Sequence, residues 1–118
     1  MDAAAALADL MEISSQVEDA VALDEDGTLL AATGSATSAQ ALASAAQDLL
    51  GRAARVRSAA EVTDVAALMR AGAVVAARGK GRVVAARTPA QPAVGLALYD
   101  LRTCLRALTG SEGGRAAA

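Results

Sequence analysis

The segment from about residue 37 to residue 57 limits the fold most, because its spacing predicts a helix that is apolar on two sides. One stripe of this helix contains Leu42, Ala45, Leu49, Ala53 and Val56. A second stripe contains Ala39, Ala43, Ala46, Leu50 and Ala54. A helix with two apolar faces needs cover from two directions. In a domain of this size one cover is expected from the chain's own sheet, and the other from a second chain.

Short apolar runs on both sides of this helix predict five strands. Residues 19–24 and 28–33 flank Asp26-Gly27, a dipeptide typical of a tight hairpin turn. Residues 62–70, 73–79 and 82–88 are separated by Gly72 and by Gly79-Lys80-Gly81, and they predict three antiparallel strands. Further helices are expected over residues 2–15 and 94–108, and Thr37 or Ser38 is expected to cap the central helix.

The order α-β-β-α-β-β-β-α predicts an α+β fold, with one five-stranded, mostly antiparallel sheet and helices on both of its faces. The 118 residues are expected to form one domain over residues 1–109, followed by a flexible C-terminal tail, residues 110–118, because Gly110 is expected to end the last helix. Phe and Trp are absent and Tyr occurs once, so the core has to be built from Leu, Val and Ala.

Composition argues against several classes of function. The chain has no His and a single Cys, which removes the usual ligands of zinc and haem and the usual general base, so no metal, cofactor or catalytic residue is expected. The sequence lacks a basic leader and an apolar run of about 18 residues, so a cytoplasmic protein without membrane insertion is expected. Nucleic-acid binding is not expected either, because neither a basic domain nor stacking aromatic residues are present.

Charge is divided unevenly along the chain. Residues 1–51 contain nine acidic and no basic side chains, whereas residues 52–118 contain eleven basic and four acidic ones. Either the two halves neutralise each other in the fold, or an acidic and a basic pole favour ordered association with a partner.

The acidic stretch at residues 24–28, Asp-Glu-Asp-Gly-Thr, allows three interpretations. It resembles the first motif of the haloacid dehalogenase superfamily, which implies a phosphatase with Asp24 as nucleophile and Asp26 as general acid. A calcium loop would place Ala22 and Thr33 at ligand positions, and neither residue fits. A hairpin turn explains every residue, and we take it as the prediction. Gly79-Lys80-Gly81 is likewise predicted to be a turn, and Cys104 a buried core thiol.

Taken in order, these segments resemble the Roadblock family, of dynein light-chain type, over about residues 7–108. The resemblance is carried by LMEISSQVEDAVALDEDGTLLAATG, then ALASAAQDLLGRAARV, VAALMRAGAVVAARGKGRVVAART and VGLALYDLRTCLRAL. It implies a homodimer formed through the central helix and the edge strand that follows it. The candidate interface is then the second stripe or its neighbour on the helix, together with the strand at 62–70. Its residues are Ala39, Ala43, Ala46, Leu50, Ala54, Val65, Ala67 and Met69.

The same resemblance implies a function in bacterial signalling. It suggests a dimeric, non-enzymatic regulatory or scaffold module that binds and modulates a small Ras-like GTPase or a related NTPase. The alternatives are a small-molecule-sensing domain of similar topology and, more remotely, the phosphatase that uses Asp24 and Asp26. The sequence leaves open which GTPase is bound, whether the chain acts in activation, exchange or scaffolding, and whether it pairs with itself or with a related chain.

Overall fold

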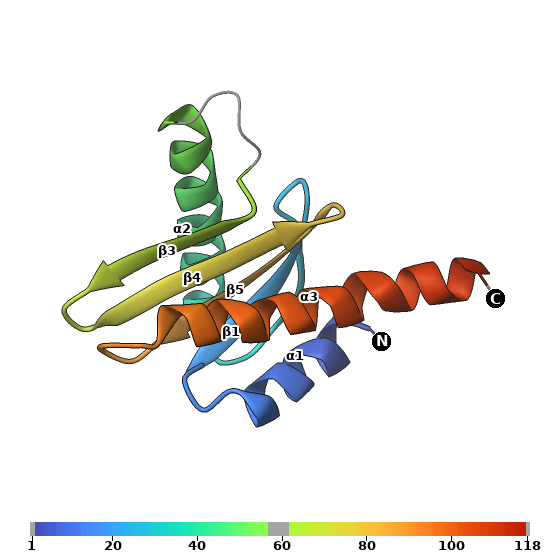
Figure 1. Cartoon of the computed structure of the whole chain (residues 1–118), viewed down its shortest axis with the longest axis horizontal. Coiled ribbons are helices and arrows are strands. Elements are labelled where there is room, and N and C mark those ends of the chain that lie inside the picture. Colours follow the sequence, from blue (N-terminus) through green and yellow to red (C-terminus); the bar gives the residue numbers. More distant parts are fainter. Residues whose placement is uncertain (1, 57–61, 118) are drawn as a thin grey trace.

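The computed structural model describes residues 2–56 and 62–117, which form three helices and five strands (Figure 1). In chain order these are α1 Ala3–Ile13, β1 Asp19–Asp24, β2 Leu29–Ala32, α2 Ala36–Val56, β3 Asp64–Met69, β4 Gly72–Gly79, β5 Arg82–Thr88 and α3 Val94–Ala117. The predicted order of elements and the α+β class are confirmed.

The strands form a single antiparallel sheet in the order β2-β1-β5-β4-β3. Helices α1 and α3 lie side by side on one face, and α2 covers the other face alone (Figure 1). Strands β1 and β5 are adjacent in the sheet although they are far apart in the sequence. Their register places Asp19 opposite Arg87 and Asp24 opposite Arg82, and the side chains of each of these two pairs form an ion pair.

Buried residues of the central strands alternate between two cores. The core under α1 and α3 takes Ala20, Ala22, Val75, Ala77, Val84 and Ala86 from the sheet. The core under α2 takes Val21, Leu23, Ala76, Val83 and Ala85. Because successive side chains of a strand point to opposite faces, the consecutive apolar residues of these strands bury both sides of the sheet.

Two helix ends differ from the sequence prediction. Helix α2 begins at Ala36, and the Ser35 hydroxyl oxygen accepts a hydrogen bond of 3.1 Å from the backbone N–H of Ser38, so Ser35 takes the capping position expected at Thr37 or Ser38. The expected last residue of this helix, residue 57, lies outside the described residues. Helix α3 continues past Gly110 to Ala117. Gly110 costs a helix only about 1 kcal/mol, Gly113 and Gly114 cost as much again each, and no proline follows them. The division into a domain of residues 1–109 and a flexible tail of residues 110–118 stays a prediction.

We also compared the helices with the requirements of a membrane span. Within residues 2–56 and 62–117, no helix has both the length and the apolar character needed to span a bilayer.

The core formed by α3 can be tested with two leucines of the same helix. Leu101 is fully buried against the sheet, whereas Leu96 is 56% exposed. We expect Leu101→Ala to lower the free energy of unfolding by about 2–5 kcal/mol because it leaves a cavity. Leu96→Ala should cost less than about 1 kcal/mol. Urea unfolding followed by circular dichroism measures both, and equal losses would contradict this packing.

Candidate interaction surface on α2 and β3

The stripe of α2 named as the candidate interface packs against the chain's own sheet. Ala39, Ala43, Ala46 and Leu50 are each at most 7% exposed and belong to the core beneath the helix. Ala54, near the end of the helix, is half-buried. Because these side chains are already covered within one chain, the neighbouring stripe is the better candidate for contact with a partner.

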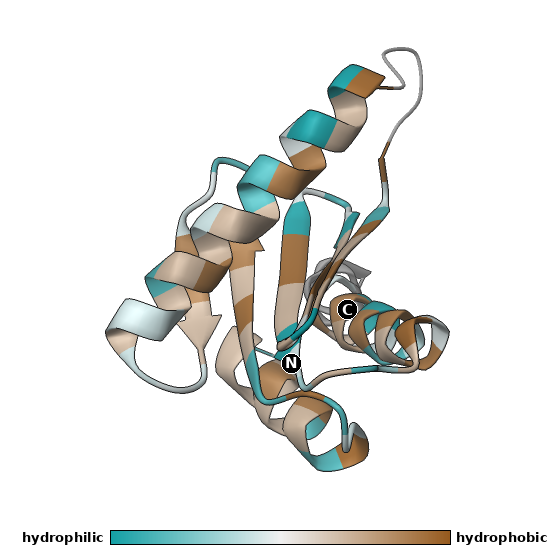
Figure 2. Cartoon of the chain, turned by 90° about the vertical axis from the view of Figure 1, so that its left-hand side faces the viewer, coloured by the Kyte–Doolittle hydropathy of each residue, from teal (hydrophilic) through white to brown (hydrophobic). Residues whose placement is uncertain are grey.

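That neighbouring stripe, here called the outer stripe, contains Leu42, Ala45, Leu49, Ala53 and Val56. Only Leu42 is fully buried, Ala45, Leu49 and Ala53 are half-buried, and Val56 is 80% exposed. Figure 2 shows α2 standing alone on its side of the sheet, with apolar segments along its length. The second cover that the sequence requires for this helix is therefore missing in a single chain.

Strand β3 lies at the edge of the sheet beside α2. Its register with β4 places Val65 opposite Ala76 and Ala67 opposite Val74. Ala76 belongs to the core under α2, so Val65, Ala67 and Met69 share the face that α2 covers. Val65 and Ala67 are half-buried and Met69 is 57% exposed. The fold thus brings the three predicted strand residues onto the same face as the outer stripe.

The free edge of β3 can hydrogen-bond to another strand. The backbone N–H of Arg78 donates to the Thr63 carbonyl, at 2.8 Å, so the backbone groups of Thr63 point toward β4. In an antiparallel pair the backbone groups of every second residue point toward the same neighbouring strand. Val65, Ala67 and Met69 therefore bond to β4, and the backbone groups of Asp64, Ala66 and Leu68 face outward.

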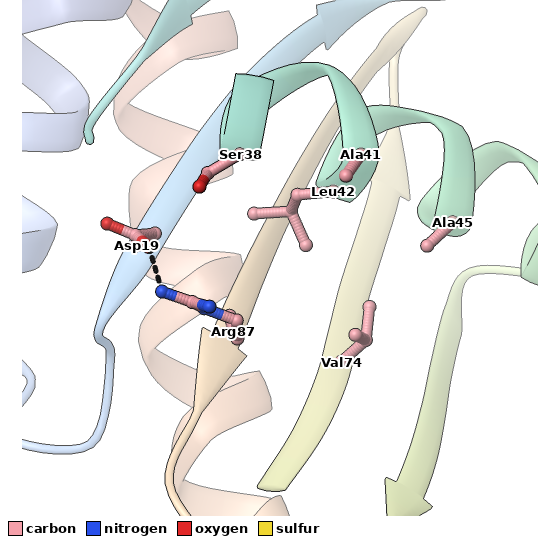
Figure 3. A pocket seen from close by; sticks show the side chains of 7 residues that line it. All are labelled: Asp19, Ser38, Ala41, Leu42, Ala45, Val74 and Arg87. Atoms are coloured by element: carbon pink, nitrogen blue, oxygen red, sulfur yellow. Dashed lines mark hydrogen bonds and ion pairs between the residues drawn. The ribbon is translucent and has the colours of Figure 1, made fainter. Parts of the chain in front are cut away.

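A small cavity of about 190 Å³ lies between the first half of α2 and the sheet (Figure 3). An ion pair between Asp19 and Arg87 forms its polar side. Its other lining residues are Ser38, Ala41, Leu42, Ala45 and Val74. Ligand pockets usually measure about 300–1,000 Å³. This cavity is therefore smaller than a usual ligand pocket, and it gives little support to a small molecule bound between α2 and the sheet.

The acidic stretch at residues 24–28 forms the turn between β1 and β2, as predicted. The backbone N–H of Asp24 donates to the Thr28 carbonyl at 2.8 Å, and that of Gly27 donates to the Asp24 carbonyl at 3.1 Å. Hydrogen bonds from the Thr28 side chain and backbone hold the pKa of Asp26 below its usual value. A general acid needs a raised pKa, so Asp26 is poorly suited to the phosphatase role. In the described part of the chain, no three acidic or Cys side chains cluster to hold a metal.

The other two sequence motifs also occupy structural positions. Lys80 and Gly81 form the β4–β5 turn, with φ angles of 51° and 75°. Cys104 is buried between α3 and α1, where its thiol donates to the Ala6 carbonyl with Sγ 3.4 Å from the oxygen. Burial, and to a lesser extent the charge of Asp9, raises the pKa of the Cys104 thiol to about 11. Both sequence predictions, a hairpin turn and a core thiol, agree with these positions.

Comparison with solved structures identifies the fold. No family model and no curated protein sequence matches this chain. A Roadblock/LC7 domain from Streptomyces avermitilis superposes with a TM-score of 0.79 at 20% identity, covering 94% of this chain and 98% of that one. The chain therefore has the Roadblock/LC7 fold, and the predicted fold resemblance is confirmed.

Structures of MglB are also similar. Myxococcus xanthus MglB matches with a TM-score of 0.70 at 13% identity, covering 94% of this chain and 88% of its own. The gliding protein MglB of Thermus thermophilus matches with a TM-score of 0.66 at 15% identity, covering 90% of this chain and 84% of its own. At these identities the likeness establishes a shared fold.

The buried thiol predicts a loss of stability in alkali. In the folded chain Cys104 stays protonated to about pH 11, whereas its ordinary pKa is 9.0. The unfolded chain therefore releases this proton first as the pH rises, and its ionisation favours unfolding. We expect this group to remove about 2 kcal/mol from the free energy of unfolding between pH 9 and pH 11. Urea unfolding of the wild type and of Cys104→Ala across this range measures the contribution, and parallel pH curves would contradict it.

Proposed function

We propose that this chain is a homodimeric, non-enzymatic regulatory or scaffold module that binds and modulates a small Ras-like GTPase or a related NTPase. It would act in the cytoplasm by presenting a surface made from two chains, which stabilises one nucleotide-dependent conformation of the partner. The observation that carries the proposal is the apolar face shared by the outer stripe of α2 and the open edge of β3.

Self-association would satisfy both parts of that face. Two copies of β3 could pair along their free edges, since the outward N–H and C=O groups of Asp64, Ala66 and Leu68 repeat on the second chain. The outer stripes of two α2 helices would then share the same side of the continuous sheet. A twofold arrangement of this kind is the commonest form of soluble oligomer. One similar structure is described as MglB with a tetrameric arrangement, which supports association by chains of this fold.

The GTPase partner follows from the resemblance to the Roadblock family, and the likeness to MglB structures is consistent with it. A non-enzymatic role agrees with the structural uses found for the residues that carried the catalytic alternative. Asp24 lies at the end of β1 in an ion pair with Arg82, and Asp26 closes the following turn.

The dimer is tested by one glutamate on each of two sides of α2. Leu49→Glu places a charge in the outer stripe, and Ser44→Glu adds the same charge at an exposed position of the same helix. Because a buried charge without a partner costs several kcal/mol, we expect Leu49→Glu to weaken dimerisation at least about a hundredfold. Ser44→Glu should leave the dimer intact. Light scattering over a range of concentrations measures the mass. A monomeric wild type would contradict the proposed dimer.

Ala46 is unsuitable for this test because it is fully buried in its own chain, where a glutamate would destabilise the fold itself.

A proline pair tests the contribution of β3. Ala66→Pro removes an N–H that faces the free edge, whereas Ala67→Pro removes one that bonds to β4. We expect Ala66→Pro to yield a folded monomer and Ala67→Pro to lower the melting temperature of the chain itself. A dimer that survives Ala66→Pro would show that β3 does not pair across the interface.

Partner binding is tested with small Ras-like GTPases from the same genome, each loaded with GDP or with a non-hydrolysable GTP analogue. We expect one of them to bind the dimer with at least about tenfold preference for one nucleotide state, and Leu49→Glu to weaken this binding. Calorimetry measures the affinity, and single-turnover GTP hydrolysis and nucleotide release separate activation, exchange and scaffolding. Equal affinity for both nucleotide states would reduce the role to scaffolding, and no binding by any of them would contradict the partner class.

A further inference from the structure

Helix α3 presents an exposed stripe on the face of the sheet opposite α2. Leu96 is 56% exposed and Tyr99, the single aromatic residue of the chain, is 61% exposed. Arg102 and Arg106 follow Tyr99 at spacings of three and seven residues, so these side chains lie along one side of the helix. Exposed aromatic and arginine residues are typical of positions that dominate binding energy in protein interfaces.

The basic end of this stripe borders a hollow of about 410 Å³ between α3 and the β4–β5 turn. Leu105 and Gly79 contribute its apolar lining, and Thr109 adds a hydroxyl. The side chain of Leu105 is close enough to Gly79 that an added Cβ there would lie 3.4 Å from it. Lys80, Arg102 and Arg106 supply its positive charge. The stripe therefore has an apolar half, Leu96 and Tyr99, and a basic half, Arg102 and Arg106, which borders a hollow lined partly by Leu105.

Few of these charges are neutralised within the described part of the chain. Arg102 forms an ion pair with Asp64, and Arg106 donates to the Thr103 hydroxyl, at 3.4 Å. Arg78 also lines the hollow, but its guanidinium donates to the Val62 carbonyl at 2.7 Å. Among the described side chains, Lys80 has no carboxylate in ion-pair contact. A second carboxylate, that of Glu25, lies beside the turn at Gly81.

We propose that this stripe of Leu96, Tyr99, Arg102 and Arg106, with Lys80 at its end, is a docking surface for an acidic, amphipathic segment of a partner protein. Apolar side chains of that segment would cover Leu96 and Tyr99, and its carboxylates would pair with Arg106 and Lys80. The ligand needs both an apolar and an acidic part. A purely acidic ligand would leave Leu96 and Tyr99 exposed, and a purely apolar one would leave the positive charges of the hollow without a partner.

The surface borders the proposed dimer at one residue, because Arg102 forms an ion pair with Asp64 of the edge strand β3. Leu96, Tyr99 and Arg106 belong to α3, which lies on the opposite face of the sheet from α2 (Figure 1), and Tyr99→Ala and Arg106→Glu leave that ion pair in place. Occupation of this stripe therefore requires neither self-association nor a GTPase, and its failure would leave the α2 and β3 proposal in place.

The test uses the full chain and a fluorescein-labelled peptide with a leucine-rich half and a glutamate-rich half. Fluorescence anisotropy measures its dissociation constant for wild type, for Tyr99→Ala and for Arg106→Glu. We expect each substitution to raise this constant about tenfold, and added salt to weaken binding. Ile13→Ala and Arg55→Glu are the matched controls at exposed positions on other helices, and they should change the constant less than about twofold. Circular dichroism establishes that all variants are folded.

Two further probes distinguish the chemistry of the ligand. A peptide with glutamine in place of glutamate and a peptide with glycine in place of leucine should both bind at least about tenfold more weakly than the original. Equal binding by the glycine peptide would reduce the surface to a general attraction for acids. Binding of phosphatidylserine vesicles in preference to the peptide would make the stripe a membrane contact. No peptide binding by the wild type, or equal binding by the stripe and control variants, would also overturn the proposal.

Discussion

Strands β1, β5 and β4 bury side chains on both faces, and this two-sided burial determines where every helix must lie. A sheet of this kind needs apolar cover above and below. Helices α1 and α3 together cover one face, whereas α2 alone covers the other (Figure 1). A single helix is narrower than a five-stranded sheet, so β3 and the outer stripe of α2 stay partly exposed. The surface proposed for self-association thus exists because two helices cover one face of the sheet and only one covers the other. It requires no special sequence motif.

Small side chains make this arrangement compact. Alanine occupies several sheet positions beneath α2 and beneath α1 and α3, so the helices can approach the strands closely. A core built in this way has no need of aromatic residues, and the single aromatic side chain of the chain, Tyr99, is on the surface. Tyr99 is therefore available for contact with a partner, and tyrosine is enriched at the positions that dominate binding energy in interfaces.

The sequence predicted the order of the elements because its apolar runs differ in period and are separated by glycines that turns require. It also predicted that α2 is apolar on two sides. Which of the two stripes faces inward could not be read from the residues, because both combine alanine with at least one leucine. In the structure the side chain of Leu50 is buried between α2 and the sheet, whereas that of Val56 is exposed. The start of α2 was missed because Ser35, one residue before the helix, is as good a cap as Thr37. The end of α3 was missed because glycine weakens a helix but, unlike proline, does not by itself terminate it.

The division of charge along the sequence has two separate outcomes in the fold. Acids of β1 meet bases of β5 at both ends of one strand pair, where Asp19 pairs with Arg87 and Asp24 with Arg82. A shift of one residue would break both pairs and would also move each buried side chain to the wrong face, so charge and burial favour the same register. Among the described side chains, Lys80 and Arg106 have no ion pair of this kind, and both line the hollow where α3 passes the β4–β5 turn. The neutralised charges thus help to align the strands, whereas Lys80 in the β4–β5 turn and Arg106 on α3 make the hollow between these two elements basic.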